Sequence, residues 1–537
     1  MTIHINQAGY LPESEKIAVM PFPAESFKVV DADGKTVFEG TCARFGFDEN
    51  SGDTVWKADF SELRAEGEYR VVSDDATSPL FKIGRDALDK TLRGLVRAYY
   101  YFRCGCELKP ENAGKFTHGA CHTTLASEWF DSSVKKDVSG GWHDAGDYGR
   151  YVTPGACAAA QLMYAYILYP NALGKLNLNI PESGNNMPDF LSEVRYELDW
   201  LMKMQKADGA VYHKVSTAQH ARFVMPERDL KPLYLLPVSS MATADLAAVC
   251  ALGYRVYKEF DSDYAEKLLD TAKLSLKWLD ENLQFIGFRN PEGCGTGGYG
   301  EGGDKDNRFW AYSEMFAATG DEKYLEKAKE LLVYDFPRTE FGVGSIGGLG
   351  ALAYLTSGRS SEDDKLAEAF KSMFVNQAHR LRWLADRSGY MAAMDERDYG
   401  WGSNMGLMKY GMIFAVCDTL CSAEGDAHEF GVYAKRQFDV LMGVNAVGMS
   451  YVSGNGERAI RNPHLRPAAA DGIDECIPGM VSGGANRRPV EEIAHRYIPK
   501  GTPPMKSFAD VQDLYSVNEV TIYWNSPAVF VAAYLLN

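Results

Sequence analysis

The sequence predicts a multidomain protein in which a small β-sandwich precedes a large all-α domain. Three observations support this fold class. The chain has 537 residues, which is enough for more than one domain. Residues 1–85 contain short runs in which polar and apolar residues alternate, whereas residues 86–537 carry apolar residues at helical spacing. We therefore expect domains at residues 1–85 and 86–537.

The N-terminal region is predicted to form several short strands. Residues 16–20, 26–40 and 67–73 are apolar or alternating runs, and the second contains Asp33-Gly34, a strong hairpin signal. Short strands at this spacing are typical of a small sandwich. Residues 74–84 would then lead into the next domain.

The remaining chain predicts helices separated by loops rich in Gly and Pro. Representative helical segments are residues 188–205, 243–260, 264–282 and 308–321. No repeat of fixed period is visible, so the sequence does not indicate a simple solenoid. We expect helical hairpins whose long loops carry the functional residues.

Composition and charge limit the partners of the protein. The formal net charge is −17 and no Lys/Arg run stands out, which argues against nucleic acid or an anionic membrane surface as a partner. No apolar stretch is long enough for a transmembrane helix. The first residues, MTIHINQAGYLP, lack the basic and apolar regions of a signal peptide. We expect a monomeric cytoplasmic protein, or a secreted one if its leader has been trimmed.

The segment GGWHDAGDYGRYV, residues 140–152, is the first candidate for catalysis. Asp144 and Asp147 lie three positions apart among glycines, which suggests a loop that approaches a ligand closely. One carboxylate could hold a water molecule while the other deprotonates it, as an inverting glycosidase requires. The alternative for such a pair is helix capping or a solvated turn.

An inverting glycosidase also needs a protonated acid on the opposite side of the sugar. The C-terminal segment YSVNEVTIYWNSPAVF offers Glu519. A lone Glu beside Val-Thr-Ile is otherwise an ordinary exposed residue of a strand or helix.

Several motifs in the same order resemble those of glycoside hydrolase family 9, in the subgroup with an N-terminal immunoglobulin-like domain. INQAGYLP resembles the start of that small domain, and GGWHDAGDYGRYV resembles the catalytic Asp loop. Later matching segments are IPESGNNMPDFLSEVRYELDWLMKMQ, GAVYHKV, PVSSMATADLAAV, YGWGSN, VSGNGERAIRNPHLRP and VNEVTIYWNSP. The similarity covers essentially the whole chain.

The resemblance implies an (α/α)6 barrel and hydrolysis of β-1,4-glucosidic bonds with inversion. It assigns the general base to Asp147, the companion that holds the water to Asp144, and the general acid to Glu519. This agrees with the requirement that the acid stays protonated near neutral pH while the base stays ionised.

The resemblance also implies residues that contact sugar. For each aromatic among them the alternative is packing in the core. The family often has two histidines before the arginine, whereas here Leu465 follows the first histidine. The candidates are His213, Trp310, Trp401, His464 and Arg466, with Tyr515 and Tyr523 as weaker ones.

A possible metal centre explains the histidine of the Asp loop. The ten cysteines are too sparse for a disulfide scaffold. Cys104, Cys121, His122 and His143 form a Cys2His2 set that suits Zn²⁺, and some family members carry zinc at matching positions. Four protein ligands would close the site, so we expect a structural metal. Cys106 is a substitute for Cys104, and the alternative is a group of buried thiols with an ordinary histidine.

A calcium site is a further expectation. Asp304, Asp306 and Asn307 in YGEGGDKDNRFW form a set of hard oxygen ligands, at a place where relatives bind Ca²⁺. Relatives usually have Asp-Glu where this chain has Asp306-Asn307, so one charge is lost. An exposed acidic loop is the alternative.

Three functions compete at this point. The first is a β-1,4-glucanase acting on cellulose-like glucans or cello-oligosaccharides, an endoglucanase or cellodextrinase. The second is an exo-β-glucosaminidase acting on chitosan oligosaccharides. The third is a non-catalytic sugar-binding protein, which the presence of all three carboxylates disfavours. A zinc-dependent hydrolase is disfavoured by the closed ligand set.

Overall fold

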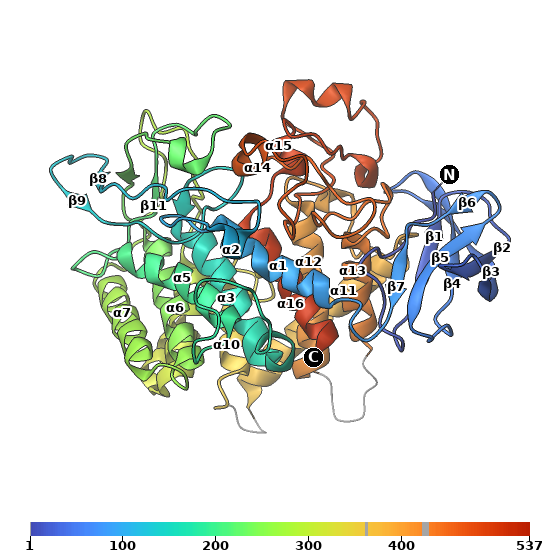
Figure 1. Ribbon diagram of the computed structural model, residues 1–537. Coiled ribbons are helices and arrows are strands. Elements are labelled where there is room, and N and C mark those ends of the chain that lie inside the picture. The colour runs from blue at the N-terminus through green and yellow to red at the C-terminus, as the bar shows by residue number, and fades with distance from the viewer. Residues whose placement is uncertain (1, 360–363, 422–428) are drawn as a thin grey trace. The chain divides into compact units, whose positions relative to one another are not determined.

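The computed structural model describes residues 2–359, 364–421 and 429–537 (Figure 1). The chain forms two compact units, one of residues 1–98 with 376–537 and the other of residues 99–375. The N-terminal strands therefore belong to the same unit as the last part of the chain. No helix among the described residues is long and apolar enough to cross a membrane.

The N-terminal region is built of antiparallel strands, drawn in blue in Figure 1, in the order β1-β4-β3-β2-β5-β6, with β7 paired to β5. The predicted turn at Asp33-Gly34 joins β2 to β3, where Gly34 N donates to Asp31 O at 3.0 Å and Gly34 has a φ of 78°. Apolar residues that include Phe27, Phe60 and Phe81 form the core. The strands are β1 (Ile17–Met20), β2 (Ser26–Asp31), β3 (Thr36–Asp48), β4 (Asp53–Asp59), β5 (Gly67–Ser73), β6 (Ala76–Thr77) and β7 (Phe81–Ile83).

Helices dominate the rest of the described chain. The predicted helical segments at 188–205, 243–260, 264–282 and 308–321 are confirmed as α5, α6, α7 and α8. The helices are α1 (Asp89–Phe102), α2 (Pro110–Ala113), α3 (Val152–Leu168), α4 (Pro170–Leu173), α5 (Asp189–Lys203), α6 (Ser240–Tyr257), α7 (Ser262–Glu281), α8 (Lys305–Thr319), α9 (Glu322–Leu331), α10 (Gly347–Leu355), α11 (Lys365–Asp386), α12 (Ser403–Val416), α13 (Gly431–Leu441), α14 (Arg466–Ala470), α15 (Tyr515–Asn518) and α16 (Ile522–Leu536). Short 3₁₀ or π turns lie at Pro226–Arg228, Glu396–Asp398, Cys417–Cys421, Glu492–Arg496 and Pro504–Lys506.

Between α3 and α12, strongly buried helices alternate with less buried ones. Helices α3, α6, α8, α10, α12 and α16 are buried on nearly all sides. Helices α7, α9 and α11 bury one face and expose the other, whereas α5 and α13 are mostly buried. A helix that is apolar all round must lie inside, whereas an amphipathic helix covers it. The alternation is that of helical hairpins with an inner and an outer layer.

A small sheet in the unit of residues 99–375 carries the Asp loop. Its order is β10-β11-β12-β8-β9, and β10 directly follows the two predicted carboxylates. β10 pairs antiparallel with β11, which leads into a loop that includes His220. The sheet thus brings loops from separate parts of the unit to the Asp loop. The strands are β8 (Ala126–Glu128), β9 (Lys135–Lys136), β10 (Arg150–Tyr151), β11 (Lys214–Ser216) and β12 (Tyr234–Leu235).

Candidate active site

Glycines and the carboxylates of α5 shape the Asp loop. Gly141 has a φ of 74°, and a Cβ there would lie 2.6 Å from Cγ of Trp200, so this position requires glycine. The next residue, Trp142, is fixed twice. Its backbone N donates to Glu197 Oε2 at 2.6 Å, and its indole Nε1 donates to Glu193 Oε1 at 2.9 Å. The loop is therefore held from the helix that packs behind it.

Asp147 is buried and its carboxylate is held by three neighbours. Its Oδ2 accepts hydrogen bonds from the hydroxyl of Tyr151 at 3.0 Å and from Gly149 N at 3.2 Å. Nδ1 of His220 lies 3.1 Å from the same oxygen. Burial, followed by the charge of Asp147, raises the pKa of Tyr151 well above its usual value, so this phenol remains a donor.

Asp144 is held by a second phenol. Only 1% of Asp144 is exposed, and its Oδ2 accepts a hydrogen bond from the hydroxyl of Tyr299 at 2.5 Å. Tyr299 has a φ of 49°, and its ring centroid lies 4.9 Å from that of Tyr151. The two carboxylates are thus positioned by two tyrosines that contact each other.

Two residues at this site, Tyr299 and His220, were not predicted from the sequence. Tyr299 lies in the glycine-rich segment GTGGYGEGGD, and its lone aromatic ring among flexible residues was the available signal. His220 lies in a polar loop after β11 and carries no motif of its own.

His213 lies in the core rather than at an exposed sugar-binding surface. Its Nδ1 lies 2.9 Å from Ser239 Oγ and its Nε2 lies 2.9 Å from Gly298 O, and the residue is fully buried. Burial lowers the pKa of His213 to about 3. Because both ring nitrogens are engaged, the predicted contact of His213 with sugar finds no support. The histidine instead holds the backbone next to Tyr299.

Trp310 is likewise a core residue. It is 0% exposed, and its indole Nε1 donates to Glu314 Oε1 at 3.1 Å. Glu314 in turn pairs with Arg255 at 2.9 Å. A ring that stacks on sugar needs an exposed face, so the expectation that Trp310 contacts substrate is corrected to a packing role.

The unit of residues 1–98 and 376–537 brings four other candidates together. Glu519 directly follows α15, and it forms a backbone bridge with His464. The ring of Tyr515 lies 5.6 Å from that of His464 and 5.3 Å from that of Trp401, measured between centroids. Trp401 is 50% exposed, which leaves ring surface available. Glu519 therefore lies beside a group of aromatic side chains.

The remaining two candidates lie at the starts of helices. Arg466 is the first residue of α14 and is mostly buried, with 8% exposed. Tyr523 lies in the first turn of α16, half-buried beside Trp524.

The predicted cysteine and histidine ligands do meet. Cys104, Cys121, His122 and His143 are all buried, and one ligand atom from each lies within 4.8 Å of the others. Cys104 Sγ is 3.8 Å from His122 Nδ1, and Cys121 Sγ is 3.9 Å from His143 Nε2. A tetrahedral zinc ion with its usual bond lengths separates sulfur and nitrogen ligands by about 3.5 Å. The cluster is a group that could hold a metal ion.

Two neighbours refine this cluster. The carboxylate of Asp229 lies 3.5 Å from Nε2 of His122, on the ring nitrogen that does not face the sulfur. Although burial alone would lower it, Asp229 and the Cys104 sulfur raise the pKa of His122 to about 9. Cys106, the alternative to Cys104 in the prediction, is half-buried and lies outside the ligand set. Cys104 is the cysteine that joins the cluster.

The predicted calcium ligands are buried rather than exposed. Among the described residues, their carboxylates do not belong to a group of three or more His, Cys, Asp or Glu ligand atoms close enough to share one ion. Asp304 Oδ2 pairs with Arg308, while Asp306 Oδ2 accepts a hydrogen bond from Ile346 N at 3.0 Å. Asn307 donates to Asp245 Oδ1 at 3.0 Å. Within the described part of the chain, Asp304 Oδ1, Asn307 Oδ1 and Asp245 Oδ2 are buried oxygens without a hydrogen-bond donor.

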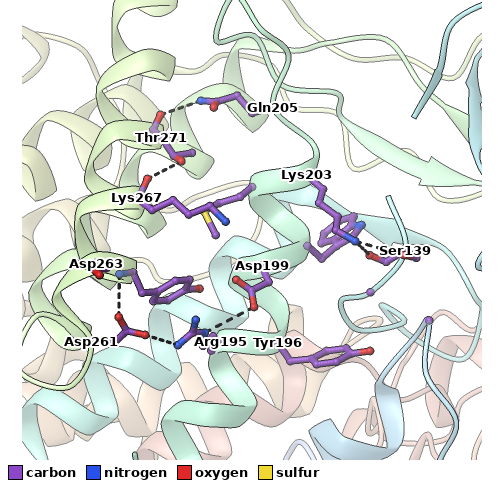
Figure 2. Close-up of a pocket in the computed structure, with 15 residues that line it drawn as sticks. Ser139, Arg195, Tyr196, Asp199, Lys203, Gln205, Asp261, Asp263, Lys267 and Thr271 are labelled. Carbon is purple, nitrogen blue, oxygen red and sulfur yellow. Dashed lines mark hydrogen bonds and ion pairs between the residues drawn. The ribbon is translucent and has the colours of Figure 1, made fainter. Parts of the chain in front are cut away.

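A separate cavity of about 980 Å³ lies between α5 and α7 (Figure 2). Its charged side chains pair with one another, as Arg195 does with Asp261 at 2.9 Å and with Asp199 at 3.8 Å. None of the predicted catalytic or sugar-contact residues lines it. The cavity is therefore not part of the candidate active site.

Models of two known domain families match this chain. The model of the cellulase N-terminal Ig-like domain matches residues 1–78, and the model of glycosyl hydrolase family 9 matches residues 89–532. The chain belongs to glycosyl hydrolase family 9. It is a glycoside hydrolase, with an immunoglobulin-like β-sandwich before an (α/α)6-barrel domain, as the sequence predicted.

Relatives of this family 9 chain match over its whole length. It is 43% identical to a cellodextrinase of Butyrivibrio fibrisolvens, with 99% of each chain covered. It is 33% identical to endoglucanase D of Acetivibrio thermocellus, covering 100% of this chain and 83% of the relative.

Two solved endoglucanase structures are similar to this chain over nearly its whole length. A single mutant of a thermostable endoglucanase from Alicyclobacillus acidocaldarius matches with a TM-score of 0.93 and 34% identity, covering 100% of this chain and 99% of that one. A Zn-binding triple mutant of the family 9 endoglucanase J30 matches with a TM-score of 0.91 and 35% identity, covering 98% of this chain and 99% of that one.

Proposed function

We propose that this family 9 enzyme hydrolyses β-1,4-glucosidic bonds of cello-oligosaccharides with inversion, using Asp147 as general base and Glu519 as general acid. The observation that carries the proposal is the paired arrangement of Asp144 and Asp147, each buried and each held by a tyrosine hydroxyl. Two carboxylates fixed on one short loop can share a single water molecule.

The proposed reaction is a direct displacement. Asp147 takes a proton from the water, and the water oxygen forms a bond to the anomeric carbon from the side opposite to the leaving group. Glu519 gives its proton to the glycosidic oxygen as the bond from that oxygen to the anomeric carbon breaks. Asp144 holds the water, and Tyr151 keeps the carboxylate of Asp147 in place. One sugar hydroxyl and one inverted hemiacetal result.

The preference for soluble oligosaccharides rests on the similarity to a cellodextrinase over nearly the full length of both chains. The test is chromatography of products from cellohexaose and from a chitosan hexamer. We expect cleavage of cellohexaose and not of the chitosan hexamer. The reverse result would favour the exo-glucosaminidase function, and cleavage of neither would favour a sugar-binding protein.

The stereochemistry has its own test. Inversion of a β-linked substrate yields the α-anomer first, which ¹H NMR detects before mutarotation. An initial β-anomer would exclude the proposed roles of Asp147 and Glu519 while leaving hydrolysis itself intact.

We further propose that Cys104, Cys121, His122 and His143 hold a structural Zn²⁺. The donor set suits zinc, and the imidazole–carboxylate pair formed by His122 and Asp229 is the arrangement that commonly orients a zinc ligand. The ion would tie the start of the Asp loop to residues 104–122. It takes no part in the chemical steps.

We also propose a Ca²⁺ site at Asp304, Asp306 and Asn307, to which Asp245 adds an oxygen. The buried oxygens of Asp304, Asn307 and Asp245 without donors support it, because a hard cation would satisfy them. Thermal melts in EGTA test it. We expect added Ca²⁺, and not equimolar Mg²⁺, to raise the melting temperature, and no response would return this cluster to a purely structural role.

We propose that the sequence domains divide near residue 85, at residues 1–85 and 86–537. The matched family models, which end at residue 78 and begin at residue 89, support this division.

A further inference from the structure

His220 touches the proposed catalytic base, yet the reaction described above gives it no role. Its Nδ1 lies 3.1 Å from Asp147 Oδ2, and its side chain is 40% exposed whereas that of Asp147 is 8% exposed. A partly exposed imidazole therefore contacts a buried carboxylate. An imidazole is the side chain whose charge ordinarily changes near neutral pH.

The backbone around His220 is held in place despite this exposure. The ammonium of Lys231 donates to His220 O at 2.9 Å. The hydroxyl of Thr217 donates to Gln219 O at 2.7 Å, and Gly295 N donates to Ala218 O at 2.8 Å. The contact with Asp147 is therefore made by a residue on an anchored loop.

The other titratable groups around Asp147 have different roles. Tyr151 stays protonated and donates to the carboxylate. Asp144 lies on the same loop and is engaged by Tyr299. Lys214 is fully buried and donates to Asn290 Oδ1 at 2.7 Å, to the hydroxyl of Thr296 and to Gly297 O. Its charge also interacts with Asp147, and this interaction is present in every His220 variant. His213, whose pKa burial lowers to about 3, carries no charge in the working range.

We propose that His220 is a positioning residue for the catalytic base, which orients the Asp147 carboxylate through Nδ1–H and, when cationic, keeps that carboxylate ionised. This inference rests on the proposed role of Asp147. It concerns the pH range of the enzyme rather than the chemistry itself.

The positive charge of a cationic His220 determines the direction in which the pKa of Asp147 changes. A cation near a carboxylate favours the ionised form and lowers its pKa, by about one to three units when the pair is well shielded from water. Partial exposure of His220 places the effect at the lower end of this range. Because a general base must be ionised to accept a proton, removing the cation should move the acid limb of the activity profile to higher pH.

Two variants separate the hydrogen bond from the charge. In His220→Asn, the side-chain Nδ2 takes the place of the imidazole Nδ1 and can still donate, but it cannot become cationic. His220→Ala removes both. The matched control is His495→Asn, because His495 is also an exposed histidine with its Nδ1 on a backbone oxygen, that of Glu492 at 2.6 Å.

The measurement is kcat/KM on cellohexaose from pH 4 to 9. We expect the acid limb of His220→Asn to move up by about one pH unit, which is about tenfold lower kcat/KM on that limb. Its plateau should stay within about twofold of the wild type, while His220→Ala should lose several-fold on the plateau as well. His495→Asn should follow the wild-type profile throughout.

The outcomes separate this inference from the proposed function. An unmoved acid limb in His220→Asn, with Asp147→Asn inactive as expected of a base, would overturn the role of His220 alone. Full activity in Asp147→Asn would overturn both. A uniform loss in both His220 variants at all pH values would assign His220 to loop structure, and would also overturn the proposal.

Discussion

The carboxylate of Asp229 lies 3.5 Å from Nε2 of His122, whose Nδ1 faces the sulfur of Cys104 at 3.8 Å. The two ring nitrogens are thus divided between a carboxylate and the proposed metal position. Such a carboxylate fixes the ring orientation and the position of the proton, and it raises the basicity of the ligating nitrogen. A thiol pair and two buried imidazoles without this orientation would be a weaker argument for zinc.

We expect purified protein to contain about one zinc per chain, since a closed four-ligand site holds one ion. Chelation should lower the melting temperature, because ligation energy is partly folding energy. Asp229→Asn should bind zinc about 10–100-fold more weakly while still folding in excess zinc. Elemental analysis and competition with a colorimetric chelator measure these values. Zinc-free protein with normal stability would mean that the cluster is a group of buried thiols and ordinary histidines that binds no metal.

The proposed acid and base should respond differently to the leaving group. Glu519→Gln should lose most turnover on cello-oligosaccharides but keep more on an aryl cellobioside with an activated phenolate, which leaves without protonation. Asp147→Asn should lose activity on both substrates, because water attack is still required. Initial rates on the two substrates give the comparison. Equal and small losses in both variants would make these residues structural.

Local elements could be predicted from the sequence because their signals are local. The Asp33-Gly34 turn is fixed by the conformational freedom of Gly34. Helix α5 follows from the spacing of its apolar residues. The association of the N-terminal strands with residues 376–537 could not be predicted. It depends on pairs such as Asn6 Nδ2 with Asp439 Oδ1 at 2.7 Å, which lie 433 positions apart.

The residues of the candidate site also fall into those that the sequence predicts and those that it does not. The acidic loop and the cysteine–histidine set are recognisable because their residue types are rare together. Tyr299, His220 and Asp229 reach the site on separate loops, where no motif marks them. The burial of individual tryptophans was not predicted either, since the sequence marked both Trp310 and Trp401 as sugar contacts, yet only Trp401 is exposed.

The buried His213 should make stability depend on pH. Its pKa is about 3 in the folded protein because burial disfavours the charged form, against about 6.5 for an ordinary imidazole. The unfolded chain gains a proton below pH 6.5 and the folded chain does not. Stability is therefore complete above pH 6.5 and falls as the pH drops towards 3, by about 2 kcal/mol between pH 7 and 5.

Urea unfolding of His213→Phe checks this expectation. The variant should be less stable at pH 7, since the partner groups on Ser239 and Gly298 lose their hydrogen bonds. Its stability should fall less steeply than that of the wild type between pH 7 and 5. An identical slope in the two proteins would mean that other groups cause the acid sensitivity.

The two tryptophans predicted from the same resemblance should behave in opposite ways. Trp401 is 50% exposed beside Tyr515, so Trp401→Ala should weaken binding of long cello-oligosaccharides by about 1–3 kcal/mol and leave the melting temperature nearly unchanged. Trp310 is 0% exposed and donates to Glu314, so Trp310→Ala should destabilise the fold by about 3–5 kcal/mol. Isothermal titration into a Glu519→Gln background and thermal melts measure both quantities. A stability loss in Trp401→Ala with unchanged affinity for oligosaccharides would place Trp401 in the core, because it would show that the ring packs against the fold and does not contact substrate.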